Sequence, residues 1–128
     1  MNSNIRNGGN AVAITIKNLR LRTVIGVDEA ERRGRQEVIA NITFTVAGGQ
    51  AAESDDLADT VDYAALSDRI AQEVEGSQFR LLEALAGRIC RIVLADPKVG
   101  QVTVEVDKPG ALKSADSVSA TCRAERKR

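Results

Sequence analysis

Lys108 is the side chain in this sequence that is best placed for proton-transfer chemistry. It follows an alternating apolar run over residues 102–106 and precedes Pro109 and Gly110. This pattern predicts a lysine at the end of a buried strand, held beside a turn. A lysine that is partly shielded from water loses proton affinity, which suits general acid–base catalysis near neutral pH. The competing interpretation is an ordinary surface lysine.

Three other polar side chains are candidates for the same site. Tyr63 opens a predicted helix and is the one tyrosine of the chain; its phenol either passes a proton or packs in the core. Glu83 lies in the first turn of a second predicted helix. There its carboxylate either stabilises the helix N-terminus or accepts two parallel hydrogen bonds from a planar, guanidine-like ligand. Glu31 belongs to a charged loop over residues 27–36, where it is either solvated or directed at a ligand.

The composition removes several classes of catalysis. The chain has no histidine, which excludes Ser-His-Asp and Cys-His catalysis and histidine-ligated metals. Acid–base chemistry therefore falls to Lys, Tyr, Cys, Asp or Glu. Asp55 and Asp56 are adjacent, but no further carboxylate cluster stands at a useful spacing from them. We therefore expect no metal and no cofactor.

The totals also bound partners and compartment. The chain has 18 basic and 18 acidic residues, and its aromatic residues are one Tyr and two Phe. We therefore expect no nucleic-acid binding. No apolar run approaches the ~20 residues of a membrane span, and the first ten residues have no signal core. Cys90 and Cys122 show neither metal spacing nor a CxxC pair, which favours small buried residues in a reducing compartment. These features predict a cytoplasmic protein without a membrane partner.

The hydrophobic pattern predicts an α+β domain with the order β-β-α-α-β-β. A strand over residues 12–25 changes phase at Lys17–Asn18, as at a β-bulge. The other predicted elements are a strand over 37–46, a helix beginning near Tyr63 and capped at Thr60 or Asp62, a helix over 79–94, and strands over 102–106 and 118–122. We expect one four-stranded antiparallel sheet with both helices on its apolar face. Residues 1–10 are predicted to be a disordered leader, 11–125 one domain, and 126–128 a solvated basic tail.

An open sheet of this kind has two long edges, which proteins seldom leave bare. Pairing of these edges with identical chains would close a barrel of several subunits. The pattern therefore predicts a homo-oligomer.

Four stretches together identify a family resemblance. IKNLRLRTVIGVDEAERRGRQEV, SDDLADTVDYAAL, VEGSQFRLLEALA and VEVDKPGALKSADSVS resemble the bacterial dihydroneopterin aldolase / dihydroneopterin triphosphate 2′-epimerase family. The resemblance extends from about Val12 to Thr121, and the order and spacing of the stretches are specific. It implies the tunnelling fold (T-fold), in which four subunits form a barrel and two such rings often stack as an octamer. Active sites then lie between subunits.

The resemblance also implies roles for individual residues. Glu83 corresponds to the carboxylate that anchors the pterin, and Leu82 adds backbone contacts beside it. Lys108 corresponds to the catalytic lysine. Tyr63 corresponds to a catalytic tyrosine that reaches in from the adjacent subunit, with Val61 and Asp62 close to the pterin. Glu31 corresponds to a loop glutamate that faces the side chain of the substrate.

The chemistry implied is a retro-aldol cleavage that needs neither a Schiff base nor a metal. The dihydropterin ring accepts the electrons as the C1′–C2′ bond of 7,8-dihydroneopterin breaks, which yields glycolaldehyde and 6-hydroxymethyl-7,8-dihydropterin. Addition of the aldehyde to its other face inverts C2′, so one site supports both aldolase and epimerase activity.

Two alternatives to this aldolase remain. One is a dedicated 2′-epimerase of the triphosphate, because LRLRTVIG and ADSVS resemble that branch whereas KPGAL resembles the aldolases. For such a substrate, phosphate contacts would come from arginines on the first strand and the charged loop: Arg20, Arg22, Arg32, Arg33 and Arg35. The other alternative is a pterin-binding protein without catalysis, which the presence of Tyr63, Glu83 and Lys108 disfavours.

Overall fold

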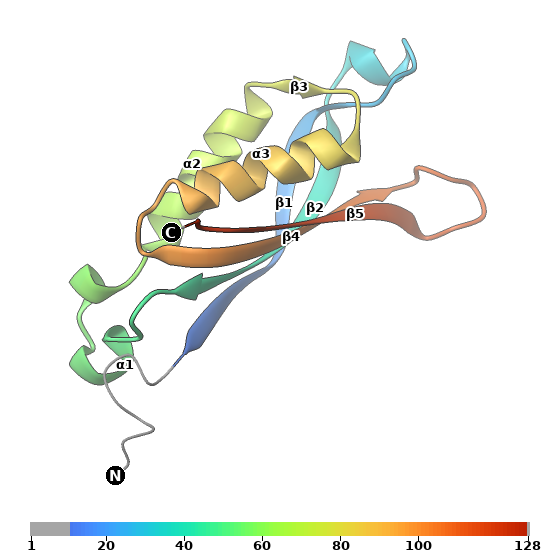
Figure 1. Ribbon diagram of the computed structural model, residues 1–128. Helices are drawn as coiled ribbons and strands as arrows, with labels where there is room; N and C mark the ends of the chain where they lie inside the picture. Colours follow the sequence, from blue (N-terminus) through green and yellow to red (C-terminus); the bar gives the residue numbers. More distant parts are fainter. Residues whose placement is uncertain (1–10, 128) are drawn as a thin grey trace.

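The computed structural model of the chain describes residues 11–127. Two helices lie across one face of a strongly twisted sheet (Figure 1). The strands are β1 (Val12–Ile25), β2 (Gln36–Val46), β3 (Gln78–Phe79), β4 (Val99–Pro109) and β5 (Ser117–Glu125). The helices are α1 (Ala51–Ser54), α2 (Tyr63–Glu75) and α3 (Leu82–Leu94), with single 3₁₀ turns η1 (Glu31–Arg33) and η2 (Leu57–Asp59). The predicted α+β class and the order of its main elements are confirmed.

The sheet has the strand order β3-β1-β2-β4-β5. The four expected strands pair antiparallel, β1 with β2, β2 with β4, and β4 with β5. The predicted phase change is a bulge, because Ile16 pairs with Ile42 whereas Leu19 pairs with Ala40. Within it, Asn18 adopts a φ of 54° and its N–H donates to Oδ1 of Asn41 at 2.9 Å. The bulge keeps apolar side chains on the core face on both of its sides.

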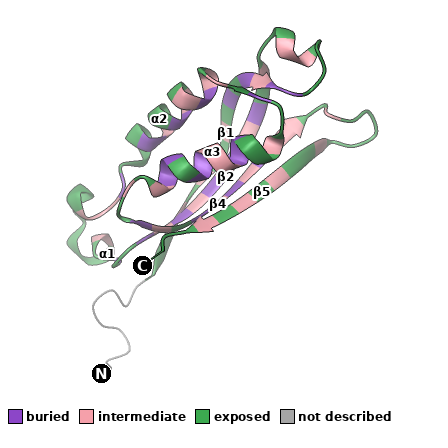
Figure 2. Cartoon of the chain, turned by 45° about the horizontal axis from the view of Figure 1, so that its top comes forward, coloured by how far each residue is buried: buried purple, intermediate pink, exposed green. Residues whose placement is uncertain are grey.

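The core lies between the sheet and the apolar stripes of α2 and α3, as the purple residues of Figure 2 show. In α2 the buried residues are Leu66, Ile70 and Val74, which confirms the predicted helical spacing. Thr23 is the one polar residue among those classed as buried in the described chain. Its hydroxyl lies 2.8 Å from the Val74 carbonyl and 3.0 Å from that of Ser77, and it fixes the end of α2 to β1.

The structure differs from the expected fold in its shortest elements. A fifth strand, β3, pairs parallel with the end of β1 through Val24 and Ile25, so the sheet is mixed rather than wholly antiparallel. Because Phe79 belongs to this strand, α3 begins at Leu82 rather than near Phe79. The short helix α1 and the turn η2 were not predicted either, since neither is long enough to show a helical apolar period.

Arg126, in the predicted solvated basic tail, is exposed, but its guanidinium also makes contacts that the sequence did not predict. Its Nε donates to the carbonyl of Val99 at 3.0 Å, and its Nη2 donates to the carbonyls of Leu94 and Asp96. A cation at this position satisfies carbonyls that the end of α3 leaves without helical partners. The predicted leader over residues 1–10 lies outside the described residues.

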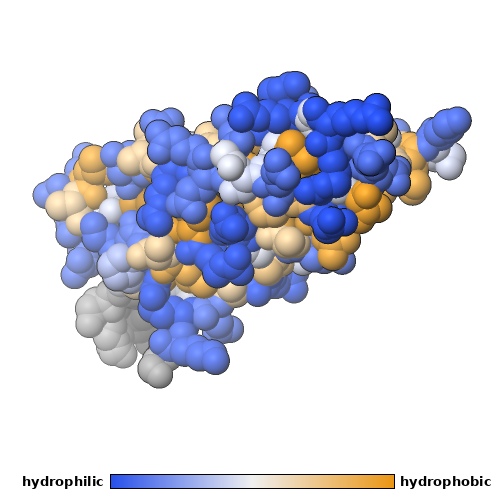
Figure 3. Space-filling model, turned by 90° about the horizontal axis from the view of Figure 1, so that it is seen from above, coloured by the Kyte–Doolittle hydropathy of each residue, from blue (hydrophilic) through white to orange (hydrophobic). Residues whose placement is uncertain are grey.

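One face of the described chain is mostly polar (Figure 3), and the sheet has open edges. Polar side chains dominate the face seen in Figure 3, with apolar side chains in groups between them. Along the described residues, the outer edge of β5 has no strand partner, and the outer edge of β1 has one only at Val24–Ile25. No residue of β5 is fully buried. No helix within residues 11–127 has the length and apolar character of a membrane span.

Candidate functional site

A hollow of about 240 Å³ brings together four of the predicted site residues. They come from separate parts of the chain: Glu31 from η1, Leu82 and Glu83 from the start of α3, and Lys108 from the end of β4. Lys108 is the last residue but one of β4 and pairs with Val118 of β5. We call this cavity the Lys108 hollow.

Lys108 and Glu31 form an ion pair inside the Lys108 hollow. The Nζ atom of Lys108 lies 2.5 Å from Oε2 of Glu31, and the two side chains are only 12% and 28% exposed. The hydrogen bond from Lys108 lowers the pKa of the Glu31 carboxyl below its ordinary value, and the backbone N–H of Asp28 adds to this shift. Glu31 is therefore not the freely solvated loop residue of the competing interpretation. The pair places a proton donor and a proton acceptor side by side.

Gly26 makes room for this pair. A Cβ atom at position 26 would lie 2.3 Å from Oε1 of Glu31, and the residue has a φ of +137°. Both features favour glycine, because other residues rarely adopt such a φ and would collide with the carboxylate. Arg32 fixes the same loop by donating from Nη1 to the carbonyls of Gly26 and Phe79 at 2.9 and 3.2 Å. The loop that carries Glu31 is thus anchored to the end of the sheet.

Glu83 presents a carboxylate at the rim of the Lys108 hollow. It lies in the first turn of α3, as predicted, and its side chain forms no hydrogen bond or ion pair within residues 11–127. The N-cap residue, Leu81, provides no side-chain cap. Leu82 packs against the core and holds this turn in place. A planar ligand with adjacent N–H groups would find both oxygens of Glu83 available.

Sequence reasoning missed several residues of the Lys108 hollow. Arg80 lines it just before the predicted Leu82–Glu83 pair, and Val27, Ala111 and Val118 add apolar surface. Arg80 had a weak signal, since it stands inside the stretch VEGSQFRLLEALA, one of the four that carry the family resemblance. The apolar residues had none, because only the folded chain brings their three segments together.

The other predicted site residues lie elsewhere. Val61 and Asp62 line a separate hollow of about 200 Å³ that also contains Arg69 and Asp96. Asp62 caps α2, since its Oδ1 accepts from the backbone N–H groups of Ala64 and Ala65 at 3.1 and 3.2 Å. Tyr63 follows it and is 61% exposed, so it does not pack in the core. Figure 1 shows the start of α2 and the start of α3 at opposite ends of the helix layer. We call residues 61–63 the Tyr63 segment.

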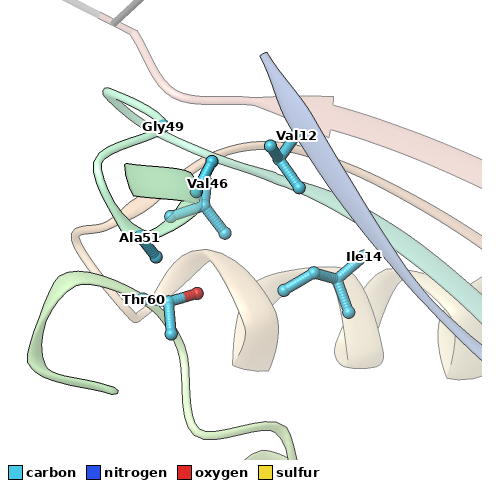
Figure 4. Close-up of a pocket in the computed structure, with 7 residues that line it drawn as sticks. Val12, Ile14, Val46, Gly49, Ala51 and Thr60 are labelled. Atoms are coloured by element: carbon cyan, nitrogen blue, oxygen red, sulfur yellow. The ribbon is translucent and has the colours of Figure 1, made fainter. Parts of the chain in front are cut away.

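Another hollow near the Tyr63 segment is apolar. It has a volume of about 240 Å³ and lies between the start of β1, the end of β2 and α1 (Figure 4). Its walls include Val12, Ile14 and Val46, and the hydroxyl of Thr60 is the one side-chain polar group among its lining residues. This surface contains no titratable group and provides no acid–base chemistry.

The match to a protein-family model establishes the family of the chain. Residues 14–123 match the family model described as dihydroneopterin aldolase. The chain belongs to the dihydroneopterin aldolase family. The resemblance inferred from the four sequence stretches is thereby confirmed.

Relatives within the dihydroneopterin aldolase family carry two different activities in their names. The dihydroneopterin triphosphate 2′-epimerase of Escherichia coli K12 is 41% identical over 111 residues, 87% of this chain and 92% of that protein. The dihydroneopterin aldolase of the same organism is 32% identical over 105 residues, 82% and 86% of the two chains. A crystal structure of E. coli dihydroneopterin aldolase in complex with neopterin matches with a TM-score of 0.82 at 30% identity, covering 88% of this chain and 98% of that one. This chain is thus similar both to a lyase and to an isomerase of the family, and it is an enzyme.

The two cysteine thiols lie outside the Lys108 hollow. Burial raises the pKa of the Cys90 thiol to about 12, so it is protonated at neutral pH. Cys90 and Cys122 are both free, and Sγ of Cys90 lies 3.5 Å from the carbonyl oxygen of Cys122. Across residues 11–127, no group of three or more His, Cys, Asp or Glu side chains is arranged to hold a metal ion.

Proposed function

We propose that this enzyme cleaves the C1′–C2′ bond of 7,8-dihydroneopterin and also inverts C2′ at the same site. The observation that carries the proposal is the Lys108–Glu31 ion pair, which is held 2.5 Å apart in a hollow whose rim presents the carboxylate of Glu83. A positioned acid and base beside an anchor for a planar ligand is the equipment that a cofactor-free retro-aldol reaction requires.

Binding precedes the chemistry in this proposal. Glu83 accepts hydrogen bonds from the 2-amino group and N3 of the pterin, and the backbone beside Leu82 completes the contact. Two parallel charge-assisted hydrogen bonds fix the orientation of the ring as well as its affinity. The side chain of the substrate then extends toward Lys108 and Glu31, which line the same hollow.

The bond-breaking step begins at the 2′-hydroxyl. Its proton passes, through a water molecule, to the Lys108–Glu31 pair, and the oxygen forms the carbonyl of glycolaldehyde. The C1′–C2′ bond breaks, and its electron pair moves into the dihydropterin ring. Protonation at C1′, in which Tyr63 takes part, then yields 6-hydroxymethyl-7,8-dihydropterin. If the aldehyde turns over and adds back before it leaves, the bond re-forms with C2′ inverted and the proton returns.

Tyr63 reaches this site from a neighbouring subunit in the proposal. Two features support this arrangement. The Tyr63 segment and the Lys108 hollow lie at opposite ends of the helix layer (Figure 1), and most of the outer edge of β1 and that of β5 have no strand partner along the described residues. Edge pairing between copies, in a tetrameric ring or an octamer, would cover these edges and join the end of one chain to the opposite end of the next.

A second candidate is a dedicated 2′-epimerase of dihydroneopterin triphosphate. It is favoured by the 41% identity to the E. coli epimerase, against 32% to the E. coli aldolase. Both candidates share the retro-aldol step and differ in the fate of the aldehyde. An aldolase releases it, whereas an epimerase retains it until it has added back.

The test is a product assay with the purified protein. 7,8-Dihydroneopterin and its triphosphate are supplied separately, and glycolaldehyde and the 2′-epimer are measured over time. Release of glycolaldehyde from the unphosphorylated substrate supports the aldolase. Formation of the epimer from the triphosphate, with little glycolaldehyde, supports the dedicated epimerase. Tight neopterin binding without any product would show a pterin-binding protein and overturn the proposal.

A further inference from the structure

A second hollow adjoins the Lys108 hollow at Glu31. It has a volume of about 320 Å³ and is lined by Ala30, Glu31, Gly34, Arg35 and Gln36. Glu31 lines both hollows. A substrate whose ring lies at Glu83 and whose C2′ lies at the Lys108–Glu31 pair would therefore direct the far end of its side chain toward this second space. We call it the Arg35 hollow.

The contacts of the five arginines on the first strand and the charged loop show which of them is free to bind a phosphate group. Arg20 forms an ion pair with Glu37 at 3.3 Å, and Arg33 forms one with Glu29 at 3.9 Å. Arg32 is occupied with the carbonyls of Gly26 and Phe79 and with the side chain of Gln78.

Arg22 and Arg35 remain. The Nη2 atom of Arg22 donates to the backbone carbonyl of Arg35 at 3.4 Å, which brings a second guanidinium beside the same loop. In the described part of the chain, the side chain of Arg35 forms no hydrogen bond or ion pair with another residue. Arg35 is thus the arginine that lines the hollow with its guanidinium uncommitted.

Two carboxylates near Arg35 in the sequence, Glu31 and Glu37, have cationic partners. The carboxylate of Glu31 is neutralised by Lys108, and that of Glu37 is paired with Arg20. Gln36, also in the lining, uses its amide to donate to the Ile25 carbonyl at 2.9 Å. A guanidinium presents a fork of N–H donors that matches the oxygens of a phosphate group.

From this arrangement we propose that Arg35 binds the phosphate groups of a phosphorylated dihydropterin side chain and raises kcat/KM for that substrate, while the reaction of 7,8-dihydroneopterin does not depend on it. The inference rests on the proposed function, because it assumes that the dihydropterin ring lies in the Lys108 hollow. It adds the part of the site that distinguishes the two candidate substrates.

The test compares Arg35→Ala with Arg33→Ala, which removes the same charge two residues away at a side chain outside the Arg35 hollow. For each variant, kcat/KM is measured for 7,8-dihydroneopterin and for its triphosphate. We expect Arg35→Ala to lower the triphosphate-to-unphosphorylated ratio of kcat/KM about tenfold or more, mainly through KM, because one charge-assisted contact is lost. Arg33→Ala should leave that ratio within about twofold. An unchanged ratio in Arg35→Ala overturns the inference.

A second measurement separates this inference from the proposed function. Binding of inorganic tripolyphosphate to the wild-type protein and to both variants is measured by calorimetry at low salt. If wild type turns over dihydropterins but Arg35→Ala binds tripolyphosphate as well as wild type does, the inference fails and the function stands. If no dihydropterin is turned over, yet tripolyphosphate binding is lost in Arg35→Ala alone, the anion site stands and the function fails.

Discussion

The Lys108 hollow and the Tyr63 segment are built in different ways. In the Lys108 hollow, three distant parts of one chain converge on a half-buried ion pair, and Gly26 and Arg32 hold its loop in place. The Tyr63 segment is held by the Asp62 cap of α2 and by Val61, which packs in the core, and its phenol is 61% exposed. The contacts of the first region all come from one chain, whereas the second leaves its phenol exposed on the surface of that chain. The difference indicates that the folding of a single chain organises one half of the proposed site, the Lys108 hollow.

The largest expected effect on catalysis comes from removing Lys108, the lysine of the Lys108 hollow. We expect Lys108→Ala to lower kcat by about 10²–10⁴-fold while neopterin affinity changes little, because it removes an acid–base group and not the ring anchor. Glu83→Ala should do the reverse and mainly weaken binding. Steady-state kinetics and a fluorescence titration with neopterin measure both quantities. Full turnover by Lys108→Ala contradicts the mechanism.

Tyr63 and Lys108 act from neighbouring subunits in the proposed site, and paired variants test this arrangement. Tyr63→Phe should lower kcat by about 10²-fold, since it removes the phenolic proton. Co-expression of Tyr63→Phe with Lys108→Ala, followed by purification through a different tag on each, should restore activity. With random assembly of equal amounts, about a quarter of the interfaces combine an intact Lys108 with an intact Tyr63 from the neighbour.

This recovery is specific to a site shared between subunits. If both groups acted within one chain, every site of the mixed oligomer would carry one defect, and activity would remain at the level of the single variants. Mixing the two proteins after separate folding, without subunit exchange, is the matched control.

The sequence predicted the regular elements well because they repeat a local pattern. Apolar spacing located α2 and α3, and a change of phase located the bulge at Lys17–Asn18. Where a feature depends on contacts far apart in sequence, the pattern contained no information about it. Lys108 and Glu31 stand 77 positions apart, and β3 forms only because Gln78 and Phe79 meet the end of β1.

In the candidate site, too, local features were predicted from the sequence, whereas contacts between distant residues were not. Glu83 and Tyr63 occupy the helix positions that local signals predicted, the first turn of α3 and the first residue of α2. The role of Glu31 as the partner of Lys108 emerged only from the fold, and its charged surroundings in the sequence favoured a solvated residue. The contacts of Arg126 were not predicted for a related reason, because the carbonyls that it contacts lie 27 to 32 residues away.

Gly26→Ala should disturb the Lys108 hollow and spare the Tyr63 segment. The added Cβ would stand 2.3 Å from Oε1 of Glu31 at a φ of +137°, so we expect a loss of about 2 kcal/mol in the free energy of unfolding together with lower kcat. Urea denaturation and kinetics measure these effects. Gly34→Ala is the control, because its Cβ would meet no atom within 4 Å and its φ of −158° is extended. Equal stability of the two variants would show that Glu31 moves aside freely.

The smallest expected effect is the dependence of the Lys108–Glu31 ion pair on pH. The pKa of Glu31 is lowered in the folded chain from an ordinary value of 4.5, so the unfolded chain binds this proton more readily than the folded one. The stabilising contribution of the carboxylate is therefore complete above pH 4.5 and is lost as the pH falls through the lowered pKa. In urea denaturation between pH 7 and about 3.5, we expect the stability difference between wild type and Glu31→Gln to be constant at first and then to shrink.

Glu31→Gln is a suitable reference because it preserves the size of the side chain and removes its titration. Lys108 remains in both proteins, so its own charge cancels in the difference. A difference that stays constant down to the lowest pH would mean that Lys108 stabilises the carboxylate no more in the folded chain than water does in the unfolded one. The Lys108 hollow would then be organised by its loop contacts, at Gly26 and Arg32, rather than by the ion pair, and its contrast with the Tyr63 segment would be one of packing alone.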